Sequence, residues 1–211
     1  MATQAFMKLS WSALSVMSGN RLRVRGARAG RDLYITFDDG PDPVHTPALL
    51  DLLSRHGAKA TFFLIGASAE RHPAVVDRIV GEGHAIGNHS MTHPRMPRLN
   101  ARQQVQQITQ ANEVLRRWGD PTRMFFRPPN GRLTVPLVLQ ALTGGQPIML
   151  WSVDSLDYRD AAPAVVDRLT ALTPVPGDVM LFHDDGACAA RALAIMLPRW
   201  RRDGFDLRRL D

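Results

Sequence analysis

The sequence has almost no cysteine and no long apolar stretch. Cys188 is the single cysteine among 211 residues, so the chain cannot form an intrachain disulfide, and a reducing compartment is slightly favoured. No apolar run reaches the roughly 18 residues that a membrane-spanning helix requires. The composition, with 45% apolar and 22% charged residues, is typical of a soluble globular protein, and the length suits one sizeable domain.

Acidic residues are also in the minority. The 26 Lys and Arg outnumber the 20 Asp and Glu, which gives a net charge of +6, and the basic excess gathers in residues 21–31 and 198–211. Such a surface attracts anionic partners, and peripheral membrane contact through these basic ends is one alternative. A solvated surface without a partner is the simpler interpretation. Neither a basic stripe interleaved with aromatics nor zinc-finger spacing is present, so we expect no nucleic acid partner.

The first 20 residues, MATQAFMKLSWSALSVMSGN, lack the features of a signal peptide. They carry one Lys, serines interrupt the apolar segment, and there is no clean small-x-small cleavage site. We therefore expect a cytoplasmic protein. Met7, Trp11 and Leu14 would share one face of a helix, which we expect to pack on the domain; a position on a membrane surface is the alternative. Residues 1–31 are interpreted as a helical and basic extension, and residues 32–211 as the main domain.

From residue 32 onward, short apolar segments alternate with longer segments of helical periodicity. The predicted strands are 32–37, 60–65, 84–87, 124–127, 148–153, 178–182 and 205–207. The predicted helices are 47–55, 73–81, 100–118, 134–142, 163–172 and 187–202, several with Pro in the first turn or with Asn or Thr as a cap. This alternation predicts an α/β fold with a parallel sheet, either barrel-like or open and doubly wound.

Polar residues gather just after the predicted strands. The five clusters are Asp38-Asp39, His89 with His93, residues 127–131, residues 154–158 and His183-Asp184. Because the carboxyl ends of parallel strands share one edge, we expect these clusters to converge on one mouth.

The first two clusters together indicate a metal site. Taken alone, the acids of TFDDG are explained by a turn before Gly40-Pro41. His89 and His93 would lie on one side of a helical turn, and taken alone this pair of histidines could be incidental. Ser90 replaces the Glu of the H-E-x-x-H motif, so a base must come from elsewhere. One carboxylate and two imidazoles make a three-ligand site with open positions, as in catalytic zinc sites, and leave the second carboxylate as general base.

The later clusters supply further candidates. Arg127, in RPPNG at 127–131, would pair with a carboxylate while the rigid loop aims a backbone N–H at a substrate; a surface turn is the alternative. Asp154 and Asp157 follow a buried strand. His183 would be a general acid whose pKa a carboxylate raises, or a structural residue. The other histidines lack partners and are interpreted as surface or supporting residues: His45, His56, His72 and His84.

Together these segments resemble the polysaccharide deacetylase family, the NodB-type domain also called carbohydrate esterase family four. The family is marked by five ordered motifs, T-F-D-D-G, H-[ST]-x-x-H, R-x-P-[YF]-G, D-x-x-D-W and L-x-H. The corresponding residues here are 36–40 (TFDDG), 89–93 (HSMTH), 127–131 (RPPNG), 154–158 (DSLDY) and 181–183 (LFH). The similarity extends from about residue 33 to the C-terminus, so residues 32–211 would form the catalytic domain.

The resemblance implies a distorted, incomplete (β/α) barrel of about seven parallel strands and metal-dependent hydrolysis of an N-acetyl group on a sugar. It assigns Asp39, His89 and His93 to a divalent metal, most often Zn²⁺, with Co²⁺, Mn²⁺ and Ni²⁺ as alternatives. Asp38 would be the base, oriented by Arg127, and His183 the acid, held protonated by Asp157. The backbone N–H of Asn130 would stabilise the oxyanion, and Leu181 would receive the acetyl methyl group. The substrate wall would include Pro129, Trp151 and Tyr158.

Two positions depart from the family pattern. Asn130 stands where an aromatic is usual, and Tyr158 where Trp is usual. Both aromatics help to shape the substrate wall, so a small or lipid-linked amino sugar stands beside chitin and peptidoglycan as the expected substrate. Two other functions are weighed against the deacetylase. One is a carbohydrate-binding protein that retains the metal site without catalysis. The other is a 2-His-1-carboxylate iron oxygenase, which His183 fits poorly.

Overall fold

The computed structural model describes residues 18–28 and 30–211, and its centre is a parallel sheet. The strand order is β4-β3-β2-β7-β6, and β8 also pairs with β2. The strands are β2 (Asp32–Asp38), β3 (Thr61–Leu64), β4 (Ala85–Asn88), β6 (Val153–Asp154), β7 (Val179–His183) and β8 (Asp206–Arg208). The ladders between these strands are all parallel. The predicted α/β fold is confirmed.

A second pair of strands continues the sheet beyond β4. β1 (Leu22–Arg23) lies parallel to β5 (Ile148–Met149), and isolated bridges join Phe126 to Asn88 of β4 and to Ile148 of β5. Only Leu150–Ser152 separate β5 from β6, which is at the other end of the sheet path. The strands therefore follow a curved path that the described residues do not close by strand pairing, as in an incomplete barrel.

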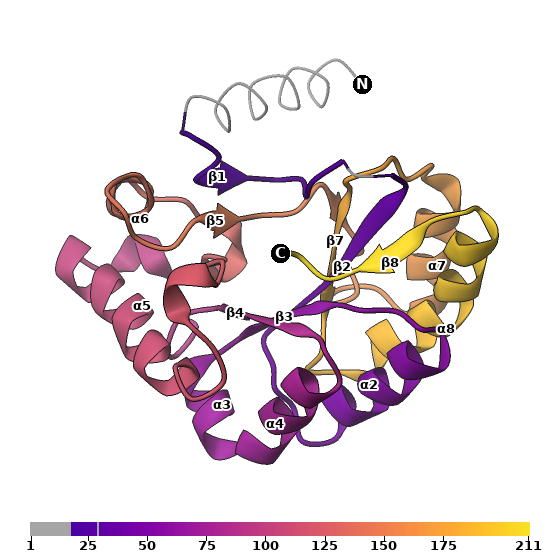
Figure 1. Cartoon of the computed structure of the whole chain (residues 1–211), viewed down its shortest axis with the longest axis horizontal. Coiled ribbons are helices and arrows are strands. Elements are labelled where there is room, and N and C mark those ends of the chain that lie inside the picture. Colours follow the sequence, from indigo (N-terminus) through magenta and orange to yellow (C-terminus); the bar gives the residue numbers. More distant parts are fainter. Residues whose placement is uncertain (1–17, 29) are drawn as a thin grey trace.

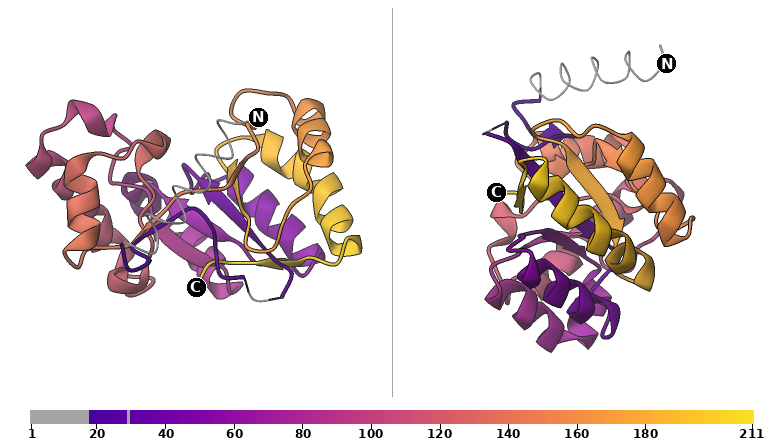
Figure 2. Two further views of the ribbon diagram at one scale, coloured as in Figure 1. Left: turned by 90° about the horizontal axis from the view of Figure 1, so that it is seen from above. Right: turned by 90° about the vertical axis from the view of Figure 1, so that its right-hand side faces the viewer.

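Helices surround this curved sheet on its outer side (Figures 1 and 2). The α-helices are α2 (His45–Arg55), α3 (Gly66–Arg71), α4 (Pro73–Gly81), α5 (Ala101–Leu115), α6 (Val135–Leu142), α7 (Ala162–Ala171) and α8 (Ala187–Arg202). Short 3₁₀ turns occur at η1 (Met96–Arg98), η2 (Pro121–Arg123) and η3 (Pro129–Gly131). α5 starts where its sequence predicts, because Asn100 and Gln103 form a reciprocal capping box.

The largest core cluster lies between the sheet and α2, α4, α7 and α8. β2 is buried along its whole length, as expected for a central strand covered on both faces. The Phe37 ring stacks on Phe62 of β3 at 4.8 Å and contacts Phe182 of β7 at 6.0 Å. This packing fixes the register in which Asp38, at the end of β2, lies beside Phe63 and His183. The core thereby sets the position of the polar residues at the mouth.

Some predicted elements differ in the structure. The strand expected at 124–127 is reduced to bridges at Phe126, and the strand expected at 148–153 is broken into β5 and β6. α3 and β1 were not predicted. Met7, Trp11 and Leu14, on which the helix prediction rests, lie outside the described residues. Among the residues that are described, no helix has the length and apolarity needed to cross a bilayer.

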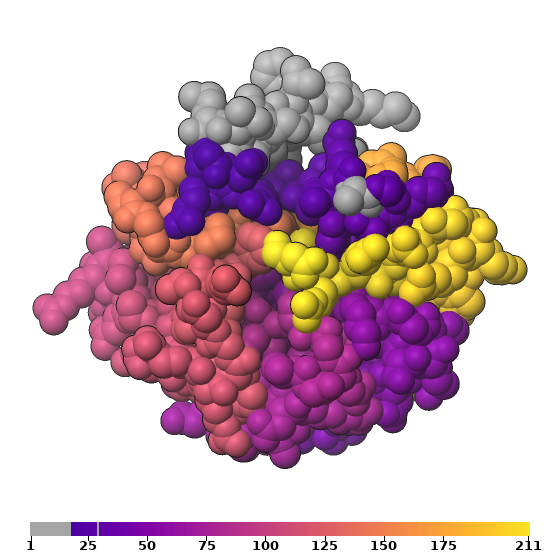
Figure 3. Space-filling model, in the orientation of Figure 1, coloured from indigo at the N-terminus to yellow at the C-terminus, as the bar shows by residue number. Residues whose placement is uncertain are grey.

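The two ends of the described chain lie side by side. Arg25 pairs with the Asp178 carboxylate, and the backbone of Arg31 bonds to Asp206 next to β8. Figure 3 shows the indigo and yellow segments adjacent on the same face. Part of the basic segment predicted as an extension thus contacts the sheet.

Candidate functional site

Asp38, the last residue of β2, is held by a buried arginine. Its Oδ1 accepts a hydrogen bond from Nη1 of Arg127 at 2.7 Å. Arg127 also donates to the Thr36 hydroxyl and to the carbonyls of Met149 and Leu150, and its guanidinium lies 3.9 Å above the Phe63 ring. Burial lowers the pKa of Arg127, and the Asp38 carboxylate opposes this shift. A charge buried this deeply requires a fixed partner, so the pair holds Asp38 in one orientation.

Asp39 faces two imidazoles instead. Its Oδ1 lies 3.2 Å from Nε2 of His93 and 3.4 Å from Nε2 of His89. One donor atom from each of the three residues lies within 4.8 Å of the others. Residues 89–93 do not form the predicted helical turn; they form a loop in which Ser90 and His93 have positive φ, 71° and 53°. The loop still brings both rings to Asp39, with centroids 5.0 Å apart.

This three-residue group fits a divalent cation. Asp39 Oδ1 is buried and, within the described chain, has no hydrogen-bond partner, because neither imidazole contact has hydrogen-bond geometry. His89 Nδ1 lies 2.7 Å from the Arg127 carbonyl, to which it donates, so the Nε2 lone pair is directed at Asp39. Although burial would raise it, the pKa of Asp39 is lowered by the two imidazoles. One carboxylate and two Nε2 atoms are donors that Zn²⁺ and similar ions accept.

His183 and Asp157 form a second ionisable pair at the mouth. Nδ1 of His183 lies 2.8 Å from Oδ1 of Asp157, whose other oxygen accepts the backbone N–H of His183. Burial alone would lower the pKa of His183, but the bond and charge of Asp157, helped by Asp38 and Asp39, raise it to about 9. The imidazolium is therefore the form that this pair favours at neutral pH.

The predicted wall residues lie on β7, beside His183, and in or against η3. Leu181 and His183 point to the same face of β7, two residues apart, and Leu181 is buried. Tyr158 is 61% exposed and sets its ring against the edge of His183. Pro129 is buried in η3, and a side chain at Gly131 would meet the Trp151 ring at 2.5 Å. Asn130 is exposed with φ 54°, a conformation that Asn adopts more readily than most residues.

Asp184 is a residue of the site region to which the sequence analysis gave no role. It is fully buried behind the Asp39 loop, where its carboxylate accepts a hydrogen bond from the Thr46 hydroxyl. Burial raises its pKa to about 7. A Cβ on Gly40 would overlap both Asp184 oxygens. The close approach of Asp184 therefore requires a glycine at the last position of TFDDG. The only sequence feature that could have indicated a role for Asp184 is its position directly after His183.

Unusual backbone angles gather at the same mouth. Apart from Asn20, the described non-glycine residues with positive φ are Asp39, Ser90, His93, Asn130 and Leu156. All five lie in the loops that carry the predicted site residues. Such angles are costly and are concentrated at functional sites, where the surrounding structure imposes them.

Comparison with known proteins identifies the chain. The sequence profile of the family described as polysaccharide deacetylase matches residues 25–145, more than half of the chain. The chain belongs to the polysaccharide deacetylase family.

Relatives of this deacetylase-family chain include a peptidoglycan deacetylase and a chitooligosaccharide deacetylase. It is 36% identical over 174 residues to a peptidoglycan-N-acetylglucosamine deacetylase of Bacillus cereus, a match that covers 82% of this chain and 63% of the relative. It is 36% identical over 162 residues to a chitooligosaccharide deacetylase of Sinorhizobium fredii, with 76% of this chain and 75% of the relative covered.

A solved relative shares the fold over almost its whole length. The crystal structure of the peptidoglycan N-acetylglucosamine deacetylase Bc1960, in complex with 4-naphthalen-1-yl-N-oxidanyl-benzamide, superposes with a TM-score of 0.85. The two sequences are 32% identical, and the match covers 93% of this deacetylase-family chain and 94% of that chain.

Proposed function

We propose that the protein is a metal-dependent hydrolase that removes the acetyl group from an N-acetylhexosamine unit of a glycan. The observation that carries the proposal is the separation of two adjacent acids into different environments. Asp38 is bound by Arg127, whereas Asp39 faces His89 and His93 with an oxygen that no hydrogen bond satisfies. Titratable neighbours in contrasting environments are typical of sites that divide catalytic roles.

Asp39, His89 and His93 would hold the cation. We propose Zn²⁺, with Co²⁺, Mn²⁺ and Ni²⁺ as alternatives, since all accept nitrogen and oxygen donors. A divalent ion there would supply a Lewis acid and lower the pKa of a water from about 15.7 to about 7.

Asp38 would act as the general base. Its Oδ1 is occupied by Arg127, and its Oδ2 lies 3.7 Å from Nε2 of His89, on the side of the predicted metal ligands. Oδ2 would accept the proton of the attacking water as its oxygen bonds to the acetyl carbonyl carbon. The backbone N–H of Asn130 would donate to the developing oxyanion, a contact whose loss typically lowers kcat about 10²–10³-fold.

His183 would act as the general acid. Its imidazolium, stabilised by Asp157, would protonate the sugar nitrogen as the C–N bond breaks, so that acetate and a free amine leave. Leu181, on the same face of β7, would lie against the acetyl methyl group. Pro129, Trp151 and Tyr158 would contact the sugar ring and its neighbours.

The substrate proposal follows the relatives. Their names point to peptidoglycan and chitooligosaccharides, which both contain N-acetylglucosamine. A small or lipid-linked amino sugar is the second candidate, favoured by the exposed Asn130 and Tyr158 where the family usually has an aromatic and Trp.

The test is Asp38→Asn. We expect acetate release from N-acetylglucosamine oligomers to fall about 10²–10⁴-fold, the usual contribution of a general base. Asn keeps an oxygen for Arg127 but loses the charge that pairs with it, so we expect a lower melting temperature by circular dichroism with zinc content at the wild-type value. Asp51→Asn, an exposed charge on α2, serves as the matched control. Full activity in Asp38→Asn would show that Asp38 is not the general base. Acetate release at background level by the wild-type protein across a broad glycan panel would favour a non-catalytic carbohydrate-binding protein.

A further inference from the structure

Two segments beside the site contain no acidic residue. The chain has neither Asp nor Glu from Pro94 to Asn112, nor from Pro121 to Val153. Five exposed arginines lie in these segments, and four of them follow the predicted site residues His93 and Asn130 along the chain: Arg95, Arg98, Arg102 and Arg132. This part of the surface therefore carries positive charge without local compensation.

Elsewhere on the surface many arginines are paired with carboxylates. Arg78 bonds to Asp51 and Glu82, and Arg168 to Asp160. Within the described chain, by contrast, no ion pair or hydrogen bond is formed by the side chains of Arg95, Arg98, Arg102 and Arg132. Arg28, Arg55 and Arg202 also lack such partners among the described residues, so what distinguishes the group of four is that the segments around it contain no acidic residue.

Two of the four arginines are close to predicted site residues along the chain. Arg95 follows the predicted ligand His93 by two residues, and Arg132 follows Asn130 by two, a span of at most about 7 Å in each case. The two segments also pack together, because Leu99 and Leu133 both pack against the buried cluster that contains Met96. The Thr134 hydroxyl donates to Gln104 of α5. We call this group of four arginines the arginine cluster.

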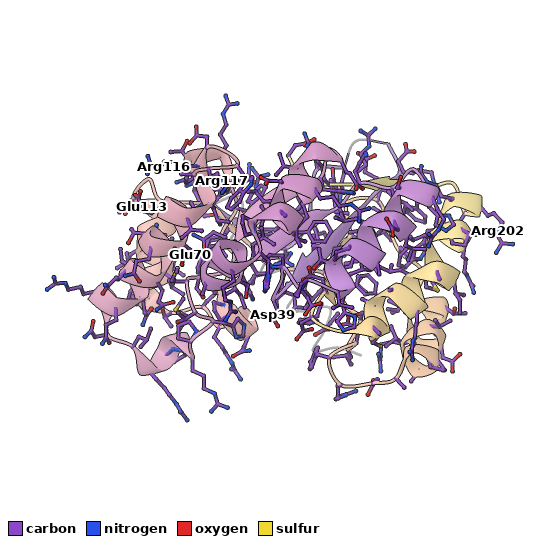
Figure 4. The ribbon with its side chains drawn as sticks, turned by 90° about the horizontal axis from the view of Figure 1, so that it is seen from below. Asp39, Glu70, Glu113, Arg116, Arg117 and Arg202 are labelled. Carbon is purple, nitrogen blue, oxygen red and sulfur yellow. The ribbon has the colours of Figure 1, made fainter. Side chains whose placement is uncertain are left out.

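Figure 4 shows how the labelled end of α5 lies relative to Asp39. Glu113, Arg116 and Arg117 label the end of α5 that lies away from Asp39, and Asp39 lies between the α5 side of the molecule and the α8 side that carries Arg202. α5 therefore begins, after Arg95 and Arg98, at the end directed toward the Asp39 side. The acidic residues Asp154, Asp157, Asp184 and Asp185 lie at or after the ends of β6 and β7, at the opposite end of the strand order from β4, which precedes Arg95 and Arg98.

We propose that the arginine cluster binds an anionic group, a carboxylate or a phosphate, carried by the glycan next to the unit that is deacetylated. This inference rests on the proposed function and narrows its substrate class from neutral chitin-like chains to anionic glycoconjugates. Guanidinium groups suit both anions, because their planar donors match two oxygens at once. The acidic side of the mouth would disfavour the same anion, so the charge pattern also sets the direction in which the glycan binds.

The experiment compares three acetylated substrates of known charge. Tetra-N-acetylchitotetraose is neutral, a hyaluronan tetrasaccharide carries carboxylates, and N-acetylglucosamine joined through a diphosphate to a short prenyl chain carries phosphates. The test variant replaces Arg95, Arg98, Arg102 and Arg132 by Gln. The matched control replaces four exposed arginines outside these two segments by Gln and changes the net charge equally: Arg28, Arg55, Arg117 and Arg202.

We expect the wild-type protein to prefer at least one anionic substrate over the neutral one. The ratio of kcat/KM on that substrate to kcat/KM on chitotetraose should fall about tenfold or more in the test variant, as expected when several exposed ion pairs are lost together. The ratio should stay within about twofold in the control, and 0.5 M NaCl should reduce the wild-type ratio by screening. If the test variant loses the preference only for hyaluronan, the bound group is a carboxylate. If it loses the preference only for the diphosphate substrate, the bound group is a phosphate.

An equal ratio in the wild-type and test proteins would overturn the proposal, as would an equal loss in the control variant. Binding of the same three ligands to Asp38→Asn, with and without the four Arg→Gln changes, is measured by calorimetry in parallel. Absence of acetate release from all three substrates would contradict the proposed hydrolysis, yet an arginine-dependent preference for the anionic ligands would still support the cluster. If the four Arg→Gln changes do not alter the relative affinities for the three ligands, the proposed anion site is rejected even if deacetylation is observed.

Discussion

At the scale of single residues, the site depends on how Asp38 and Asp39 are separated. Asp38 continues the extended backbone of β2 and points to Arg127, whereas Asp39 has φ 78° and turns out of the strand toward His89 and His93. Side chains of adjacent strand residues already point to opposite faces, and the left-handed turn completes the separation. Asp38 therefore contacts the Arg127 guanidinium and Asp39 the imidazoles of His89 and His93, which offsets the repulsion expected between neighbouring acids.

The pair of His183 and Asp157 gives a residue-scale prediction about pH. His183 has a pKa of about 9, above its usual 6.5, so the ion pair stabilises the fold fully below pH 6.5 and loses this effect as pH rises through about 9. In Asp157→Asn we expect the His183 pKa to fall, the alkaline limb of the kcat profile to shift to lower pH, and kcat at pH 8 to drop. Acetate release from pH 5 to 10 and the ¹H–¹⁵N spectrum of His183 measure this. An unchanged alkaline limb would exclude His183 as the titrating acid.

The sequence could predict residues whose chemistry appears in a motif, and it failed where burial decides. Asp39, His89 and His93 were predicted by motif, and the structure brings them together; their roles stay predictions. His84 was interpreted as a surface or supporting residue, yet it is a core residue. Its Nδ1 accepts the Ala60 N–H, its ring contacts Phe62, and burial lowers its pKa to about 4. No local pattern distinguishes a core histidine from a surface histidine, because burial depends on packing of distant segments.

At the scale of elements, the loop after β2 is shaped by the end of β7. Ile65 N–H donates to the Gly40 carbonyl, Asp184 N–H donates to the Asp38 carbonyl, and the Asp184 side chain binds Thr46 at the start of α2. The loop that presents Asp39 is thus fixed from β3, β7 and α2 at once.

This packing predicts the effect of Gly40→Ala. The new methyl group would overlap the buried Asp184 carboxylate, so we expect a loss of about 1–3 kcal/mol in unfolding free energy and a larger loss of acetate release, because Asp39 is the neighbouring residue. Gly81→Ala is the control, since its methyl group meets open space at the end of α4. Urea unfolding and acetate release are measured for both variants and for the double variant Gly40→Ala/Asp184→Ala. The double variant should be more stable than Gly40→Ala, because the overlapping carboxylate is gone. If the double variant is no more stable than Gly40→Ala, overlap with Asp184 is not the cause of the destabilisation.

Helices and strands with a strong apolar periodicity were predicted well. A strand was predicted poorly where a side chain takes the carbonyl groups of its backbone. β2, β7, α5 and α8 lie close to their predicted bounds because apolar patterning and caps define them. The apolar run at 148–153 reads as one strand, but Arg127 takes the carbonyls of Met149 and Leu150, so the run is broken into β5 and β6. That interruption comes from a residue more than twenty positions earlier and leaves no local signal.

At the scale of the whole molecule, the predicted metal ligands connect two parts of the sheet. Asp39 follows β2, whereas His89 and His93 follow β4, and β3 lies between these strands. His89 is additionally bonded to the Arg127 carbonyl, which joins the group to the loop before η3. A cation bound by all three residues would therefore cross-link segments that are brought together only in the folded chain, and would bind the unfolded chain weakly.

This arrangement predicts that metal stabilises the entire domain. At a free Zn²⁺ concentration of 100 times Kd, the unfolding free energy should rise by about 2.7 kcal/mol, because the ion binds the folded state alone. For a chain of this length we expect Tm to rise by about 5–10 °C over chelator-treated protein. His93→Gln should lose most of the shift, whereas His56→Gln, a histidine at the end of α2 remote from Asp39 in the fold, should keep it. Scanning calorimetry with and without Zn²⁺ measures the shift. An equal shift in both variants would show that zinc stabilises the protein at another site, and no shift in the wild-type protein would show that the three residues do not hold zinc tightly.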